Sequence, residues 1–133
     1  MVRKIDHIAI AVRSIDEALP FYRDRLGIEP TMIKDVPAEG VRIAFLPIGD
    51  TEIELLEPLG PETTVAKFIE KRGPGLHHIC FDVEDIAGAL TELKGSGVPL
   101  IDTEPKQGAV AKVGFLHPKA SGGVLIELSE REA

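Results

Sequence analysis

The sequence predicts an α+β fold made of two tandem βαβββ modules, whose strands form a curved mixed sheet with the helices on its outer side. Three observations support this prediction. The two halves of the chain share a residue pattern, each half contains short runs of alternating apolar and polar residues, and each half has one helical stretch bounded by capping residues. With 133 residues, of which 44% are hydrophobic, the chain can form one domain with a substantial core.

The internal duplication appears when residues 5–19 are aligned with residues 76–90. His7 then falls on His78, and the aliphatic residues that follow agree in spacing. Further matches keep the same order, with "AFLP" on "GFLH" and one "IEL" on another. We therefore interpret residues 1–133 as a single domain of two repeats, at about 4–57 and 76–130, joined by a linking helix at about 63–72.

Each repeat begins with a strand, at about 4–12 or 76–83, and continues into a helix. Ser14 with Glu17 three residues later forms a capping box, Asp85 is an N-cap of the second helix, and Gly27 and Gly97 stand where a helix C-terminus is capped. Three more strands are expected in each repeat, at about 30–36, 41–47 and 51–57 in the first and at about 99–103, 111–117 and 123–129 in the second.

Composition excludes several classes of protein. The net charge of −7 with no basic block argues against nucleic-acid binding. The single cysteine fits a reducing compartment, and the chain has neither a long apolar run nor a signal-like N-terminus. We expect a cytoplasmic protein that is not a membrane protein.

The two adjacent histidines in "GLHHI" point to opposite faces of a strand, because neighbours in a strand alternate. His78 shares its face with Cys80 and Asp82, whereas His77 lies with the large aliphatic residues under the helix. His7 has the equivalent position in the first repeat. Taken alone, a strand histidine is usually structural, and His77 is interpreted as structural or as a residue that supports a ligand. Cys80 is expected only to line the face.

Glu54 and Glu127 each interrupt an apolar strand, and the duplication makes them equivalent. A buried carboxylate is costly unless it has a partner. Two imidazoles and two carboxylates brought together would form a site for a divalent first-row metal such as Co, Mn, Fe, Ni or Zn, with open positions for Lewis-acid chemistry. His117, near a strand end, is expected in a turn or near substrate rather than as a ligand.

These features resemble the vicinal oxygen chelate superfamily, and within it the methylmalonyl-CoA epimerases. The resemblance covers nearly the whole chain. It is most specific in "KIDHIAIAV", "GLHHI" and "HPKASGGVLIEL", the last of which differs from the "DP(D/N)G" typical of glyoxalase I.

The resemblance implies that His7, Glu54, His78 and Glu127 are metal ligands, with Co²⁺ the first expectation and Mn, Ni, Fe or Zn as alternatives. Some relatives have Gln at the position of Glu54. Two departures stand out. Ile43 occupies the position of a glutamate proposed as an acid/base in some relatives, and Ala109 and Val110 replace glycines in the turn before the "FLH" strand.

The resemblance also implies interconversion of (2R)- and (2S)-methylmalonyl-CoA through an enolate, by a homodimer acting on a small acyl-CoA. We expect Glu127 to move a proton at C2, with Glu39 a weak candidate for the second base. Lys112, Lys119 and Ser121 are candidate contacts for the CoA phosphates or the substrate carboxylate.

Three alternatives remain open. A glyoxalase I-like lactoylglutathione lyase would use the same ligands and also begin with proton abstraction. A ring-cleaving dioxygenase would need only two His and one carboxylate. A non-catalytic ligand-binding protein of this fold typically lacks the metal residues and uses aromatic side chains, and this chain has no Trp and one Tyr.

Overall fold

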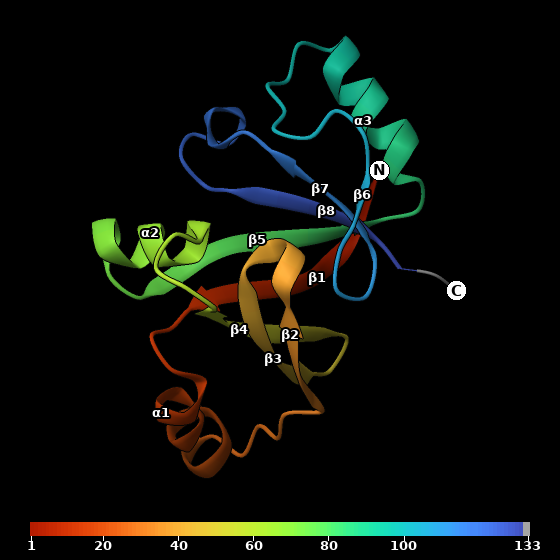
Figure 1. The fold of residues 1–133 in the computed structure, drawn as a ribbon. Helices are drawn as coiled ribbons and strands as arrows, with labels where there is room; N and C mark the ends of the chain where they lie inside the picture. The colour runs from red at the N-terminus through yellow and green to blue at the C-terminus, as the bar shows by residue number, and fades with distance from the viewer. Residues whose placement is uncertain (132–133) are drawn as a thin grey trace. The chain divides into compact units, whose positions relative to one another are not determined.

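The computed structural model describes residues 1–131, which divide into two compact units. One unit contains residues 7–77, and the other contains residues 1–6 together with the chain from residue 78 onward. Strand β1 (Val2–Ala11) and strand β5 (Gly75–Val83) each run from one unit into the other along the chain. Figure 1 labels the elements of both units.

The unit of residues 7–77 holds the first βαβββ module. After β1 come α1 (Ile15–Leu19), a π-helical turn (Pro20–Arg25) and a short 3₁₀ turn (Pro37–Glu39) on either side of β2 (Met32–Val36). Strands β3 (Val41–Ile48) and β4 (Thr51–Pro58) follow, then the linking helix α2 (Thr64–Arg72). The sheet order is β2-β3-β4-β1, with β1 parallel to β4 and the other pairs antiparallel.

The other unit holds the second module. β5 leads into α3 (Ile86–Gly95), followed by β6 (Lys106–Gln107), β7 (Lys112–Leu116), a 3₁₀ turn (Pro118–Ala120) and β8 (Ile126–Glu130). The sheet order is β5-β8-β7-β6, with β5 parallel to β8 and antiparallel pairs elsewhere. Each half of the chain thus has the expected βαβββ order with a mixed sheet.

In each unit the helix packs on one face of the sheet, and the strand alternation leaves the His and Glu side chains on the other. Ile15 and Leu19 of α1 pack with Leu55 of β4. In the second module, Ile86 and Leu90 of α3 pack in the same way with aliphatic residues of β5, β7 and β8, namely Val83, Leu116 and Leu128. These apolar contacts are the cores that fix the sheets beneath the helices.

The predicted helix caps are confirmed. Ser14 Oγ accepts a hydrogen bond from the Glu17 N–H at 3.2 Å, and Asp85 Oδ1 accepts one from the Gly88 N–H at 3.1 Å. Gly27 and Gly97 follow their helices with φ of 73° and 83°, a left-handed conformation that favours glycine.

A second set of caps was not predicted. Glu57 Oε1 accepts a hydrogen bond from the Ile15 N–H at 2.7 Å, and Glu130 Oε1 accepts one from the Ile86 N–H at 2.9 Å. Each carboxylate stands at the end of the last strand of its module and satisfies an N–H in the first turn of the helix. The duplication therefore extends to the contact between helix and sheet.

The prediction of a strand at about 99–103 is wrong. Residues 99–103 contain a single isolated bridge, between Leu100 and Leu116, and the edge of this sheet is the short strand β6. Pro99 has no N–H to donate, and Asp102 accepts the Phe115 N–H through its side chain, Oδ2, at 2.8 Å. Part of the backbone pairing remains, because the His117 N–H donates to the Pro99 carbonyl and the N–H groups of Ile101 and Asp102 both donate to the Phe115 carbonyl.

The first helix also differs from expectation, because it changes from α-helix to π-helix at Pro20. Proline lacks the N–H that would continue the α-helical hydrogen-bond pattern. Beyond this turn, Leu26 N–H and Ile28 N–H donate to the carbonyls of Phe21 and Tyr22.

Two buried carboxylates fasten the first residues of β1 to their own unit. Arg131 donates to both oxygens of Asp6, at 2.7 and 3.2 Å, and Arg3 Nε donates to Asp82 Oδ2 at 2.8 Å. Asp6 and Asp82 are both buried, and such carboxylates need these charged partners. None of the helices within residues 1–131 is both long and apolar enough to span a membrane.

Candidate metal centre

The second module presents a buried pair formed by His78 and Glu127. His78 Nε2 lies 3.1 Å from Glu127 Oε1, and each residue is 5% exposed. The pair follows from the parallel register of β5 and β8, in which Cys80 is the partner of Glu127. Since Cys80 is two residues after His78, the imidazole and the carboxylate lie on the same face of neighbouring strands.

The first module contains the equivalent pair. His7 Nδ1 lies 3.2 Å from Glu54 Oε2, and both residues are 6% exposed. Here β1 and β4 are parallel, and Ala9 is the partner of Glu54. Ala9 stands two residues after His7, as Cys80 stands after His78, so the same register produces the same pair twice. The structure thus brings each predicted histidine to its predicted glutamate within its own unit.

The chemistry of these donors fits a divalent first-row metal. Each pair supplies one imidazole nitrogen and one carboxylate oxygen, and imidazole favours ions such as Co, Ni, Fe and Zn over Mg or Ca. Buried carboxylates are costly without a partner, so the burial of Glu54 and Glu127 is itself consistent with a cation-binding role. Each pair alone offers too few ligands for a tight site.

Each glutamate has a phenylalanine as its register partner on the neighbouring antiparallel strand. Phe45 of β3 is the register partner of Glu54, and Phe115 of β7 is the register partner of Glu127. The ring of Phe115 also contacts the ring of His78 in a T-shaped arrangement, with centroids 5.3 Å apart. These two phenylalanines were not among the residues predicted for the site, although the aligned segments "AFLP" and "GFLH" place both at one repeat position.

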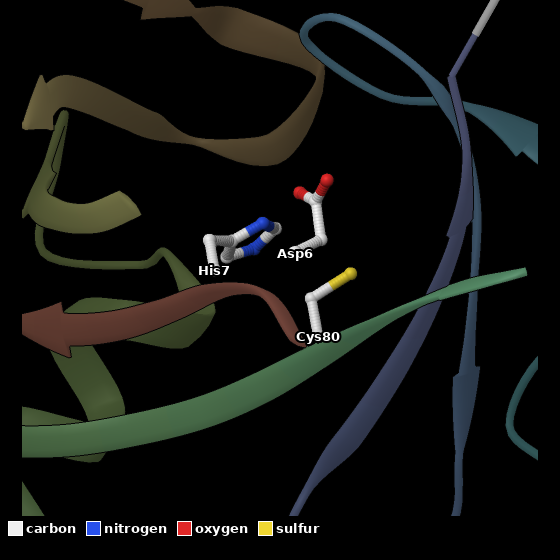
Figure 2. Close-up of side chains that lie close together, drawn as sticks. All are labelled: Asp6, His7 and Cys80. Atoms are coloured by element: carbon white, nitrogen blue, oxygen red, sulfur yellow. The ribbon is translucent and has the colours of Figure 1, made fainter. Parts of the chain in front are cut away.

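Cys80 is buried beside the Asp6 carboxylate. Figure 2 shows the two side chains close together, and their potential ligand atoms lie within 4.8 Å of each other. Asp6 already accepts two hydrogen bonds from Arg131. A fully buried thiol beside a carboxylate is not in the accessible, electropositive setting of a reactive cysteine. This agrees with the interpretation of Cys80 as a lining residue.

The remaining histidines have structural contacts. The ring of His77 packs in a T-shaped arrangement on Phe68 of α2, with centroids 4.8 Å apart. His117 caps the 3₁₀ turn after β7, where its Nδ1 accepts the Lys119 N–H at 3.1 Å. The expectation that His117 lies in a turn is confirmed, whereas the structural role of His77 stays a prediction.

The predicted substrate contacts lie in the second module. Lys112 is the first residue of β7, and Lys119 belongs to the turn that follows this strand. The Ser121 hydroxyl accepts the Val124 N–H at 3.0 Å and donates to carbonyl oxygens of the same turn. Its hydrogen bonds therefore shape the turn.

Glu39, the candidate for the second base, and Ile43 both lie in the first module. Ile43 is 2% exposed and shares its strand face with Phe45, so an aliphatic side chain occupies the position for which the resemblance implied a glutamate. Glu39 ends a 3₁₀ turn and is half-buried. The sequence departure at Ile43 is thus a feature of the site face.

Resolved pKa shifts of carboxyl groups occur on the exposed surface. A hydrogen bond from Arg42 lowers the pKa of Asp35, and one from Arg23 lowers the pKa of Asp24, with a further contribution from the nearby positive charge in each case. Both carboxylates are exposed at the surface of the first module and belong to neither His–Glu pair.

Comparison with known proteins agrees with this fold. The family model described as the glyoxalase/bleomycin resistance protein/dioxygenase superfamily matches residues 6–115. The chain belongs to this superfamily, which confirms the expected fold of two βαβββ modules with a mixed sheet.

Individual relatives narrow the family further. The ethylmalonyl-CoA/methylmalonyl-CoA epimerase of Cereibacter sphaeroides is 44% identical, over 98% of this chain and 99% of that protein. The mitochondrial methylmalonyl-CoA epimerase of Mus musculus is 40% identical, over 96% of this chain and 72% of that protein. A solved methylmalonyl-CoA epimerase in complex with methylmalonyl-CoA and NH4+ superposes with a TM-score of 0.96 at 35% identity, over 100% of this chain and 97% of that one. Within the superfamily, the chain belongs with the methylmalonyl-CoA epimerases.

Proposed function

We propose that this chain is an isomerase that interconverts (2R)- and (2S)-methylmalonyl-CoA. The observation that carries the proposal is the pair of buried His–Glu contacts, His7 with Glu54 and His78 with Glu127, in a chain similar over almost its full length to methylmalonyl-CoA epimerases. The acidic C2–H of this substrate lies between a thioester and a carboxylate. Its removal and return on the other face accounts for epimerisation.

We further propose that these two pairs together ligate one divalent ion, with Co²⁺ first and Mn, Ni, Fe or Zn as alternatives. The internal duplication supports this assignment, since the four residues occupy two equivalent positions in each repeat. A bound divalent ion would supply Lewis-acid stabilisation of the negative charge that develops on the substrate oxygens. The imidazoles bind as neutral ligands and the carboxylates as anions, so two Glu residues would neutralise the ion's charge.

Glu127 is proposed to move the C2 proton. The C–H bond breaks, the proton passes to a carboxylate oxygen, and the electron pair delocalises onto the thioester carbonyl as an enolate. Return of a proton to the opposite face completes the inversion and needs a second acid. Since Ile43 offers none, Glu39 is the candidate for this role in the first module.

Lys112, Lys119 and Ser121 are proposed to contact the CoA phosphates or the substrate carboxylate, because the two lysines are exposed ammonium groups and all three residues lie on β7 or the turn after it. Ser121 would contribute by holding that turn through its hydrogen bonds to Val124.

We also propose a cytoplasmic homodimer. Sedimentation at micromolar concentration tests the dimer, and a single monomeric species would reject it.

An assay on two substrates tests the proposed function. Purified protein, loaded with Co²⁺, is given a single epimer of methylmalonyl-CoA in one arm and the hemithioacetal of methylglyoxal and glutathione in the other. We expect epimerisation in the first arm and no lactoylglutathione in the second. Turnover of the hemithioacetal alone would establish the glyoxalase alternative, and binding of methylmalonyl-CoA without turnover would establish a ligand-binding protein.

A further inference from the structure

Phe115 contacts the His78 ring and is the register partner of Glu127 on the neighbouring strand. It is the antiparallel register partner of Glu127 across β7 and β8, and its ring meets the His78 ring at an interplanar angle of 85° with centroids 5.3 Å apart. In this T-shaped geometry the positive edge of one ring faces the negative face of the other. This ring–ring contact is additional to the hydrogen bond between His78 Nε2 and Glu127.

Phe115 is itself fixed from its other side by two charged residues. Its N–H donates to Asp102 Oδ2 at 2.8 Å, and Lys106 Nζ lies 3.3 Å from the same oxygen. Lys106 Nζ also lies 5.2 Å from the centroid of the Phe115 ring, in a cation–π contact. Asp102 therefore ties the backbone of Phe115 and the cation over its ring to one carboxylate, and the ring is held in place.

The imidazole needs such a contact because the torsion about its Cβ–Cγ bond has a broad energy minimum, unlike a torsion between two tetrahedral carbons. In this structure the 3.1 Å contact with Glu127 orients the ring. If His78 Nε2 and Glu127 both turn to a metal ion, that hydrogen bond is lost. The contact with Phe115 can persist, since it is a ring–ring contact separate from the hydrogen bond with Glu127.

We propose that Phe115 is a positioning residue for His78, and that its ring, held by Asp102 and Lys106, keeps the imidazole oriented for metal binding. This inference rests on the proposed ligand set. Phe115 acts through His78 and takes no part in the proton transfer. The residues that surround a metal ligand and fix its orientation commonly change metal affinity by about 10- to 100-fold when they are replaced.

The test measures Co²⁺ affinity rather than turnover. Co²⁺ is titrated in competition with a chromophoric chelator, into wild type, Phe115→Leu, Phe115→Tyr and Phe81→Leu. Leu keeps much of the apolar volume and removes the ring, while Tyr keeps the ring. Phe81→Leu is the matched control, because Phe81 is a half-buried phenylalanine of the same unit that packs on the helix side. Thermal unfolding of all four proteins records the stability change of each substitution.

We expect Phe115→Leu to bind Co²⁺ about tenfold more weakly and to alter the visible absorption of the bound ion. Phe115→Tyr should bind nearly as wild type, and Phe81→Leu should lose stability without losing affinity. Equal affinity of Phe115→Leu and wild type would overturn the inference, as would an equal loss in Phe81→Leu. A wild-type chain that binds no Co²⁺ would instead overturn the proposed ligand set and this inference with it.

Discussion

Glu127 lies 3.1 Å from Nε2 of His78, and the two are brought together by the parallel register of β5 and β8 rather than by proximity in sequence. The same register places Glu54 beside His7 in the other module. Two copies of one arrangement, both buried, distinguish a candidate metal centre from an isolated strand histidine. The predictions below separate the roles of the residues in this arrangement.

Replacing His78 should abolish metal binding, whereas replacing its neighbour should not. We expect His78→Ala to lower metal affinity by at least about a hundredfold, since loss of a ligand should cost more than loss of a residue that only orients one. His77→Ala is the matched control, because His77 packs on Phe68. Elemental analysis after dialysis provides the measurement. Equal metal loss in both variants, or in neither, would reject the assignment of His78.

Glu127→Gln separates metal binding from proton transfer. An amide oxygen can still coordinate, so metal binding should weaken but recover with excess metal. An amide cannot accept a proton at neutral pH, so we expect activity to stay depressed about a hundredfold or more at metal saturation. Steady-state kinetics at increasing Co²⁺ concentration measures the activity that remains at metal saturation.

Isotope exchange at C2 tests proton transfer by Glu127 in the same variant. Single-turnover reactions in D₂O, started from each epimer, should show that Glu127→Gln reduces solvent exchange more in one direction than in the other, because each base serves one face. Full activity with unchanged exchange from both epimers would place the base elsewhere, and Glu39 and Glu54 would be the next residues to replace.

Metal affinity should fall as the pH is lowered from about 7 to about 5. Protons compete with the ion for the imidazole and carboxylate ligands, which must be deprotonated to bind it. Chelator competition across this range measures the effect in wild type and in His77→Ala, which should show the same slope. An affinity that does not change with pH would exclude the proposed ligands.

Two glycines at the end of α3 should respond to alanine with opposite signs. Gly97 has φ of 83°, so Gly97→Ala should lower the free energy of unfolding by about 1 kcal/mol through backbone strain. Gly95 is the last residue of α3, and the space around it is open, so Gly95→Ala should raise the free energy of unfolding by about 0.5 kcal/mol. Denaturant unfolding measures both, and destabilisation by Gly95→Ala would contradict the assigned helix end.

The sequence was sufficient for the features that repeat or alternate. His7, His78, Glu54 and Glu127 could each be placed on the strand face opposite the large aliphatic residues because strand alternation has a fixed period. The caps at Ser14 and Asp85 depend on local hydrogen bonds and were also predictable.

The features that were missed depend on contacts between distant segments. The Asp102 side chain accepts the Phe115 N–H while the N–H groups of Ile101 and Asp102 donate to the Phe115 carbonyl, and nothing in the local pattern of residues 99–103 distinguishes this from a regular strand. Glu57 and Glu130 cap helices more than forty residues earlier in the chain, which no local motif indicates. In the sequence, Phe115 is only a residue shared by the two repeats, and the sheet register is needed to place it beside Glu127.

Metal removal and return tests the central claim most directly. The purified chain is stripped with chelator, its metal content is verified by elemental analysis, and epimerisation of a single methylmalonyl-CoA epimer is followed while Co²⁺ is added back. We predict that the stripped protein is inactive and that activity returns in proportion to bound Co²⁺, reaching its maximum at one ion per chain. Full epimerase activity in protein shown to contain no metal would contradict the account.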